Sequence, residues 1–184
     1  QEQRRRRGID LAVLYDNEEI GNKTKQGAES QTLLRVMEKI AGGLGFDRAA
    51  FLAMLSRSFL LSCDVAHALH PNYTQMYDEQ NRIQMGQGVG LKWNFSQKYA
   101  TDIRASAIIQ QLMEEQQIPY RKYLNRSDLP GGGTLGSAVS ALLGIPAVDV
   151  GAPILSMHSA REMMAVEDQD SLNRLLCGFF AAED

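Results

Sequence analysis

The sequence LPGGGTLG at residues 129–136, followed by the apolar run at 145–150, decides the fold class of this 184-residue chain. Glycines interrupt regular structure, so residues 129–136 predict a tight turn that opens a short helix toward Leu143. The run at 145–150 is short and apolar, as is typical of a buried strand, and residues 119–125 predict the strand before the turn. A helix between two strands is the repeating unit of an α/β sheet.

The same alternation extends toward both ends of the chain. We predict further strands at 9–15, 58–63 and 89–94, helices over 33–40, 47–55, 101–112 and 172–180, and a loop or irregular hairpin at 73–88. Together these elements predict an α/β fold with a mixed, largely parallel sheet flanked by helices. In such sheets, binding sites gather at the carboxyl ends of strands.

The glycine-rich turn has two interpretations. A glycine cluster that opens a helix can cradle an anion at the helix amino terminus. It can also allow a strand and a helix to pack with their backbones close together. Its spacing matches no phosphate-binding fingerprint, so the sequence leaves both interpretations open.

Composition narrows the classes of function. A net charge of −3 argues against nucleic acid as the main partner, and 44% hydrophobic residues suit one globular domain. No apolar run approaches the roughly 20 residues of a membrane span, and no signal peptide opens the chain. The arginine run at 4–7 is interpreted as a solvated approach to the first strand. Cys63 and Cys177 suit a reducing compartment, and we expect both to be buried free thiols.

Carboxylates and imidazoles stand where a hydrolytic metal site would need them. The chain holds three histidines, and the pair Glu18-Glu19 follows the apolar run 9–15. Successive side chains at the end of a strand point to opposite faces, so one glutamate can bind a metal while its neighbour faces a water. Divalent metals in hydrolases are bound by this mixture of oxygen and nitrogen atoms. Each residue alone also fits a structural role, such as a solvated glutamate pair or a packed histidine pair.

Four motifs together resemble one known family. They are DNEEIG at 16–21, SxDxAHAxHPNY at 62–73, KYAT at 98–101 and SMHSxRE at 156–162. These motifs closely resemble the aspartyl aminopeptidases, which are cytosolic zinc aminopeptidases with a cocatalytic pair of metals. The resemblance runs from about residue 9 to residue 180.

The resemblance implies roles for seven residues. Glu18 would be the general base, Glu19 and His158 would bind one metal, and Asp64 would bind the other. The three positions that match the family's substrate contacts are His67, Lys92 and Tyr99. Two zinc ions would activate water and polarise the scissile carbonyl, and manganese or cobalt tolerates similar ligands. His67 could donate to the oxyanion, and Lys92 could pair with an acidic side chain of the substrate.

The chain also departs from the family pattern. The segment 76–81 lacks the family's histidine, and Gly131 replaces a usual cysteine. The family's upstream histidine and bridging aspartate have no counterpart among the first fifteen residues. We therefore expect residues 1–184 to be the carboxyl-terminal portion of a single zinc aminopeptidase catalytic domain, incomplete on its amino-terminal side. Such a portion would be inactive alone and would expose apolar surface.

The resemblance also implies partners and a location. The whole protein would be a cytoplasmic homo-oligomer, a tetrahedral dodecamer in this family, acting on peptides with a free amino terminus and binding neither nucleic acid nor membrane. Two alternatives stay open. The chain could be a non-catalytic metal-binding or assembly module of this fold, or another dinuclear zinc amidohydrolase such as a carboxypeptidase or deacylase. The HALHPNY stretch at 67–73 speaks against the second.

Overall fold

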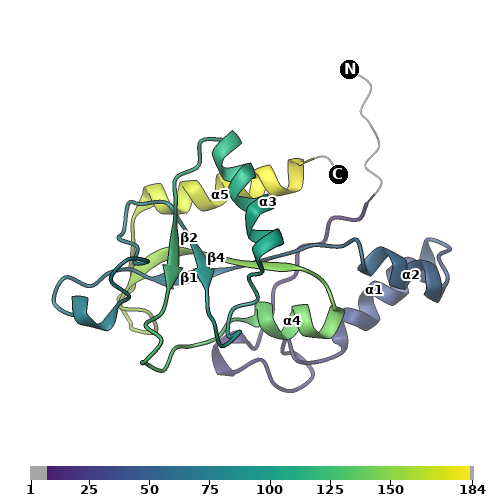
Figure 1. Cartoon of the computed structure of the whole chain (residues 1–184). Coiled ribbons are helices and arrows are strands. Elements are labelled where there is room, and N and C mark those ends of the chain that lie inside the picture. The colour runs from purple at the N-terminus through teal and green to yellow at the C-terminus, as the bar shows by residue number, and fades with distance from the viewer. Residues whose placement is uncertain (1–7, 183–184) are drawn as a thin grey trace.

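A mixed sheet forms the centre of the molecule in the computed structural model, which describes residues 8–182 (Figure 1). The arginine run at 4–7 lies outside the described residues. The strand order is β1 (Leu60–His67), β4 (Ala147–Leu155), β2 (Val89–Trp93) and β3 (Tyr120–Leu124), and the short β5 (Met163–Met164) pairs with β4. β1 with β4 and β2 with β3 are parallel, whereas β2 with β4 and β4 with β5 are antiparallel. The predicted fold class is confirmed.

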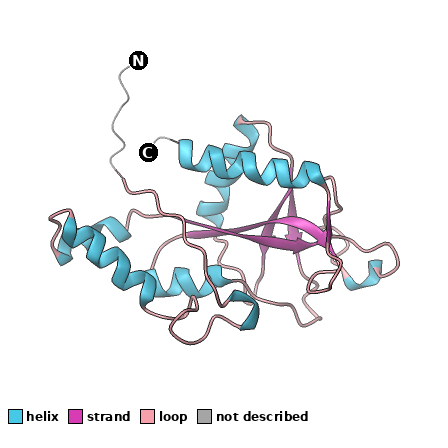
Figure 2. Cartoon of the chain, turned by 180° about the vertical axis from the view of Figure 1, so that it is seen from behind, coloured by secondary structure: helices cyan, strands magenta, loops and turns pink. Residues whose placement is uncertain are grey.

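Helices cover both faces of the sheet (Figure 2). One face carries α3 (Ile103–Glu115) and α5 (Val166–Ala181), and the other carries α4 (Leu135–Leu143). Beyond α4, α1 (Thr32–Gly43) and α2 (Arg48–Leu55) form a helical pair that shares a buried apolar cluster with it. The predicted helices are therefore present.

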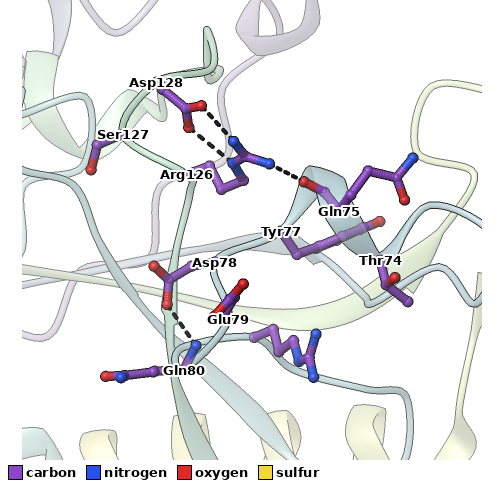
Figure 3. Close-up of a pocket in the computed structure, with 10 residues that line it drawn as sticks. Thr74, Gln75, Tyr77, Asp78, Glu79, Gln80, Arg126, Ser127 and Asp128 are labelled. Atoms are coloured by element: carbon purple, nitrogen blue, oxygen red, sulfur yellow. Dashed lines mark hydrogen bonds and ion pairs between the residues drawn. The ribbon is translucent and has the colours of Figure 1, made fainter.

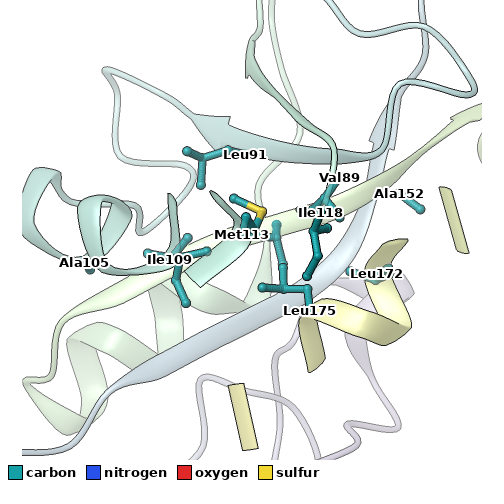
Figure 4. Packing of buried hydrophobic residues seen from close by; sticks show 11 residues of the cluster. Val89, Leu91, Ala105, Ile109, Met113, Ile118, Ala152, Leu172 and Leu175 are labelled. Carbon is teal, nitrogen blue, oxygen red and sulfur yellow. The ribbon is translucent and has the colours of Figure 1, made fainter. Parts of the chain in front are cut away.

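The main core lies between the sheet and the α3–α5 layer (Figure 4). Leu91 of β2, Ile109 and Met113 of α3 and Leu175 of α5 are fully buried there. Burying a side chain of this size contributes about 1.5–3 kcal/mol, so this cluster holds the two helices on the sheet. The next residue of β2, Lys92, points to the opposite face of the sheet.

Local sequence signals set the starts of two helices. Asp47 accepts a hydrogen bond from the Ala50 backbone N–H at 2.8 Å, and Asp102 accepts one from Ala105 at 2.7 Å. These side chains satisfy backbone donors that have no partner within the helix, which fixes the first turn. The region 73–88 is irregular as expected, apart from the 3-10 turn η2 (Thr74–Met76).

Three boundaries differ from the predictions. Residues 9–15 form no strand; residues 9–14 are exposed, Leu14 to 99%, and Tyr15 is half-buried. An apolar run becomes a strand only where a neighbouring strand takes its backbone hydrogen bonds, and this run pairs with none of the described strands. β1 continues past Asp64 to His67, and β4 continues past Val150 to Leu155.

The extension of β4 depends on a glycine. Gly151 pairs with Asp64 of β1 and with Gly90 of β2. A Cβ at Gly151 would lie 2.8 Å from the Asp64 carbonyl oxygen, so the strands can approach this closely only without a side chain. A glycine that suggests a strand end in the sequence instead permits close packing in the middle of the sheet.

Two further expectations concern the burial of the cysteines and the absence of a membrane span. Cys63 and Cys177 are free as expected, but both are exposed, so the expectation of burial is wrong. Cys63 lies on β1, which is at the edge of the sheet and has a neighbour on one side only. Among the described helices, none is both long enough and apolar enough to cross a membrane.

Candidate functional site

Asp64 and Lys92 form a buried ion pair across the central strand. Lys92 of β2 is 3% exposed, and its Nζ donates to Asp64 Oδ2 at 3.1 Å and to the Val65 carbonyl at 2.9 Å. The same Nζ lies 4.7 Å from the centre of the Tyr99 ring. Because Gly151 of β4 lies between the two strands and has no side chain, the lysine can reach over it. The pair holds the Asp64 carboxylate in one place.

Glu18 and Glu19 lie in a turn rather than at a strand end, which corrects the prediction. They open the 3-10 turn η1 (Glu18–Ile20), which Gly21 closes with a φ of 102°. Glu18 is half-buried and Glu19 is exposed, so the two side chains do diverge. Glu19 Oε2 lies 3.0 Å from His158 Nε2. The correction for Asp64 is similar, because it lies inside β1 and not at its end.

The turn after β4 presents His158. Ser156 and His158 have φ values of 58° and 66°, in the left-handed region that residues other than glycine rarely adopt. The His158 backbone N–H donates to Glu162 Oε1 at 2.7 Å, which ties the turn together. Such backbone conformations cost about 1–3 kcal/mol each and are concentrated at functional sites.

The charges of these residues act on one another. Burial, followed by the charges of Asp64 and Glu19, raises the pKa of Glu18, while Lys92 and His158 oppose the rise. Burial, followed by the positive charges of Lys92 and His158, lowers the pKa of His67. The structure thus brings together six of the seven predicted site residues as interacting charges, and the seventh, Tyr99, packs against Lys92. We name these seven residues the charged cluster.

The donor set fits a divalent metal in kind but not in number. Glu19 and His158 offer an oxygen and a nitrogen to one position, and Asp64 offers oxygen nearby. Zinc sites in hydrolases use such atoms, usually three from the protein at each metal. Within residues 8–182, no three His, Cys, Asp or Glu side chains are grouped so that they could hold a metal ion on their own. Further ligands would have to complete the site.

The comparison with known proteins decides the family. A family model described as "Aminopeptidase I zinc metalloprotease (M18)" matches residues 1–180. This chain belongs to the M18 family of metal-dependent aminopeptidases. The resemblance stated from the four motifs is confirmed.

Individual M18 proteins agree with this assignment. The chain is 41% identical over 162 residues to a probable M18 family aminopeptidase 2 of Clostridium novyi, covering 88% of this chain and 37% of that protein. It is 38% identical over 161 residues to a probable aspartyl aminopeptidase of Ricinus communis, covering 88% and 33%. The chain therefore spans well under half the length of the curated relatives it matches.

A solved M18 structure has the same fold. The structure of the S. cerevisiae mApe1 dodecamer aligns with a TM-score of 0.78 and 28% identity, over 91% of this chain and 37% of that chain. The layered α/β arrangement around the charged cluster is thus the arrangement of an M18 aminopeptidase.

Sequence reasoning missed two buried carboxylates. Asp149 of β4 is fully buried and accepts hydrogen bonds from Ser62 and from the Ala100 backbone. A lone aspartate inside an apolar strand was the available signal, because a buried charge requires partners. Asp168 lies in the first turn of α5, and its buried carboxylate accepts hydrogen bonds from the Gly86 and Gly88 N–H groups at 2.7 Å.

A hollow lies apart from the charged cluster (Figure 3). It measures about 650 Å³ between residues 74–82 and 126–128, and no residue of the charged cluster lines it. Arg126 donates to Asp128 and to the Gln75 carbonyl, and Asp78 accepts from Gln80 and Asn81. Since most of its charges are satisfied within the wall, we assign this hollow no part in the chemistry.

Proposed function

We propose that the protein is a metal-dependent aminopeptidase and that residues 1–184 form the carboxyl-terminal portion of its catalytic domain. The observation that carries the proposal is the 3.0 Å approach of Glu19 Oε2 and His158 Nε2 in a chain of the M18 family. Neither partner of that pair is buried, so the two side chains remain accessible to a ligand.

Two divalent cations, zinc in the first instance, would occupy the completed site. Glu19 and His158 would hold one cation and Asp64 the other, while Lys92 fixes the Asp64 carboxylate. The further histidine and aspartate ligands would come from residues outside this chain. Cations in such a site lower the pKa of water and polarise a carbonyl group.

The remaining groups of the cluster move protons and bind the substrate. Glu18 accepts the proton of the attacking water and passes it to the leaving amine, and its raised pKa brings it closer to the value that suits a general base near pH 7. A lowered pKa keeps His67 neutral at that pH, and its ring N–H donates to the oxyanion.

Lys92 and Tyr99 form the substrate-binding side of the site. An ammonium has three N–H donors, and Lys92 uses two of them on Asp64 and Val65. Among residues 8–182 Lys92 makes no third hydrogen bond, so we assign its remaining N–H, beside the Tyr99 ring, to a substrate carboxylate, which would favour peptides with an acidic amino-terminal residue. A relative named as an aspartyl aminopeptidase supports this preference.

The whole protein assembles as a cytoplasmic homo-oligomer. The mApe1 structure that shares this fold is named as a dodecamer, which supports a tetrahedral dodecamer here. The apolar side chains at 9–14 are exposed in this chain, and the remainder of the catalytic domain or a neighbouring subunit would bury them.

Matched substrates test the function. The full-length protein, loaded with zinc, is assayed on an aspartyl peptide with a free amino group and on the same peptide acetylated at that group. We expect hydrolysis of the free-amine peptide alone, abolished by a chelator and restored by zinc. Hydrolysis of the acetylated peptide would favour an amidohydrolase of another kind, and no hydrolysis of either would favour a metal-binding or assembly module.

A further inference from the structure

Asp149 ties the segment that carries Tyr99 to the central strand. Its carboxylate is fully buried and receives two short hydrogen bonds. Ser62 Oγ donates to Oδ1 and the Ala100 backbone N–H donates to Oδ2, both at 2.5 Å. Ala100 directly follows Tyr99, so the carboxylate acts on the backbone next to the tyrosine.

Further bonds attach the same segment to β4. The Asp149 backbone N–H donates to Thr101 Oγ1 at 2.9 Å, and the Asp102 N–H donates to the Ala147 carbonyl at 3.2 Å. These bonds involve Thr101 and Asp102, the two residues that follow Ala100. Residues 100–102 are therefore attached to β4 at three points, two of which belong to Asp149.

From this segment the contacts continue to the charged cluster. Tyr99 places its ring 4.7 Å from Lys92 Nζ, and Lys92 holds Asp64 at 3.1 Å. Lys92 and Asp149 are paired positions on β2 and β4, so their side chains leave the sheet on the same face. Asp149 thus lies on the same polar face as the groups it would position.

Structural need alone does not account for a carboxylate at this place. Burying a charge is costly unless partners replace its water, and an uncharged side chain of the same shape avoids that cost. Gly136, at the start of α4, makes room for the group, because a Cβ there would lie 2.6 Å and 2.7 Å from the two Asp149 carboxylate oxygens. The fold accommodates Asp149 at the expense of a side chain on α4.

We infer that Asp149 is a positioning residue for substrate binding: it holds Ala100, and through it Tyr99 and Lys92, in the geometry that receives the substrate. The inference rests on the proposed function in assigning Tyr99 and Lys92 to the substrate. The tether itself is independent of that assignment.

The substitution Asp149→Ala in the full-length protein tests the effect on catalysis. It removes the bond to Ala100, so Tyr99 and Lys92 lose their fixed places. Because these residues bind the substrate, we expect KM at saturating zinc to rise about tenfold, the equivalent of one lost hydrogen bond of about 1.4 kcal/mol, with kcat nearly unchanged.

The substitution Asp149→Asn provides the rescue. Its amide oxygen can accept from Ala100, and its amide nitrogen can donate to Ser62, whose hydroxyl both accepts and donates. We expect KM to return to within about threefold of the wild-type value. Thr101→Val removes only the hydroxyl that accepts from Asp149, and we expect a smaller rise in KM.

The substitution Asp168→Ala is the matched control. Asp168 is an equally buried carboxylate that receives two backbone N–H groups, but the loop it fixes is 86–88 and does not carry Tyr99. We expect Asp168→Ala to lower the thermal midpoint as Asp149→Ala does, without the tenfold rise in KM.

Hydrogen exchange supplies a readout that needs no activity. We expect amide exchange to speed up at 99–102 in Asp149→Ala and at 86–88 in Asp168→Ala. Unchanged exchange at 99–102 would overturn the inference, and so would equal KM values in the two alanine variants.

If Asp149→Ala does not fold, Thr101→Val and Asp149→Asn decide by the same two measurements. If the wild type hydrolyses no peptide, the proposed function fails, while exchange still decides on the tether.

Discussion

Glu19 and His158 lie 3.0 Å apart, between Oε2 and Nε2, although they belong to turns near opposite ends of the described chain. Their side chains are 73% and 69% exposed, and an exposed pair of this kind contributes at most about 1 kcal/mol to stability. The strained turn that presents His158 costs as much or more. The pair is therefore better explained by what it binds than by what it stabilises.

The histidine of this pair gives the first prediction. His158→Ala should remove one metal equivalent from the full-length protein, while the free energy of unfolding of the metal-free form changes by less than about 1 kcal/mol. Elemental analysis and chemical denaturation measure the two quantities. His70→Ala is the control, since His70 packs on Tyr73, with 4.9 Å between ring centres, and takes no part in the charged cluster. Loss of metal in both variants, or in neither, would contradict the assignment.

The general base gives the second prediction. Glu18→Gln keeps the size of the side chain and removes its ability to accept a proton, so kcat should fall by about 10²–10⁴ while the metal content stays the same. Steady-state kinetics and elemental analysis check this. Glu29→Gln, an exposed glutamate outside the cluster, should change neither value. Near-normal kcat in Glu18→Gln would remove Glu18 from the mechanism.

The buried lysine gives the third prediction. Lys92→Met fills the same space without the ammonium, so the Asp64 carboxylate loses the group that orients it. Partners of metal ligands are typically worth 10–100-fold in affinity, and we expect zinc to bind more weakly by about that factor. Titration against a competing chelator measures it. Lys98→Met is the comparison, because Lys98 donates to the Gly131 carbonyl at the surface; a similar loss there would show that the effect is not specific to Lys92.

The glycine-rich turn gives the fourth prediction. A Cβ at Gly136 would lie 2.7 Å from Ser62 Oγ as well as against Asp149, whereas a Cβ at Gly132 would meet nothing within 4 Å. Gly136→Ala should lower the free energy of unfolding by about 1–3 kcal/mol, and Gly132→Ala should change it by less than about 0.5 kcal/mol. Denaturant titration compares them. Equal effects would show that close packing is not the reason for the glycine at 136.

These glycines also decide between the two interpretations of the turn. The anion beside the first turn of α4 is the chain's own Asp149 carboxylate, which occupies the space in front of Gly136. Close packing of strand and helix is therefore the interpretation that the structure favours.

The parts of the fold that depend on neighbouring residues could be predicted from the sequence. Asp47 and Asp102 cap the helices that follow them, and the apolar spacing within those helices predicts their buried faces. The run at 9–15 has the composition of a buried strand but no neighbouring strand, and pairing is a property of the sheet rather than of the segment. Gly151 suggests the end of a strand in the sequence, but in the structure it lies within β4 and lets the neighbouring strand β1 approach closely.

The candidate site follows the same division. The residues of the charged cluster could be named from the chain because four motifs resemble the aspartyl aminopeptidases. The carboxylate pair and the histidines alone indicated only a candidate metal site. That Glu19 meets His158, that Lys92 holds Asp64 and that Asp149 fixes Ala100 depends on strand pairing and on the turns between strands. No local pattern contains that information.

Metal occupancy of the full-length wild-type protein tests the central claim most directly. The protein is dialysed against zinc, freed of excess metal, and measured by elemental analysis alongside its intact mass. We expect two tightly bound zinc ions per chain, held by Glu19, His158 and Asp64 together with ligands from outside residues 1–184. If the protein of full mass retains no zinc, the charged cluster is not a metal site and the proposed function is wrong.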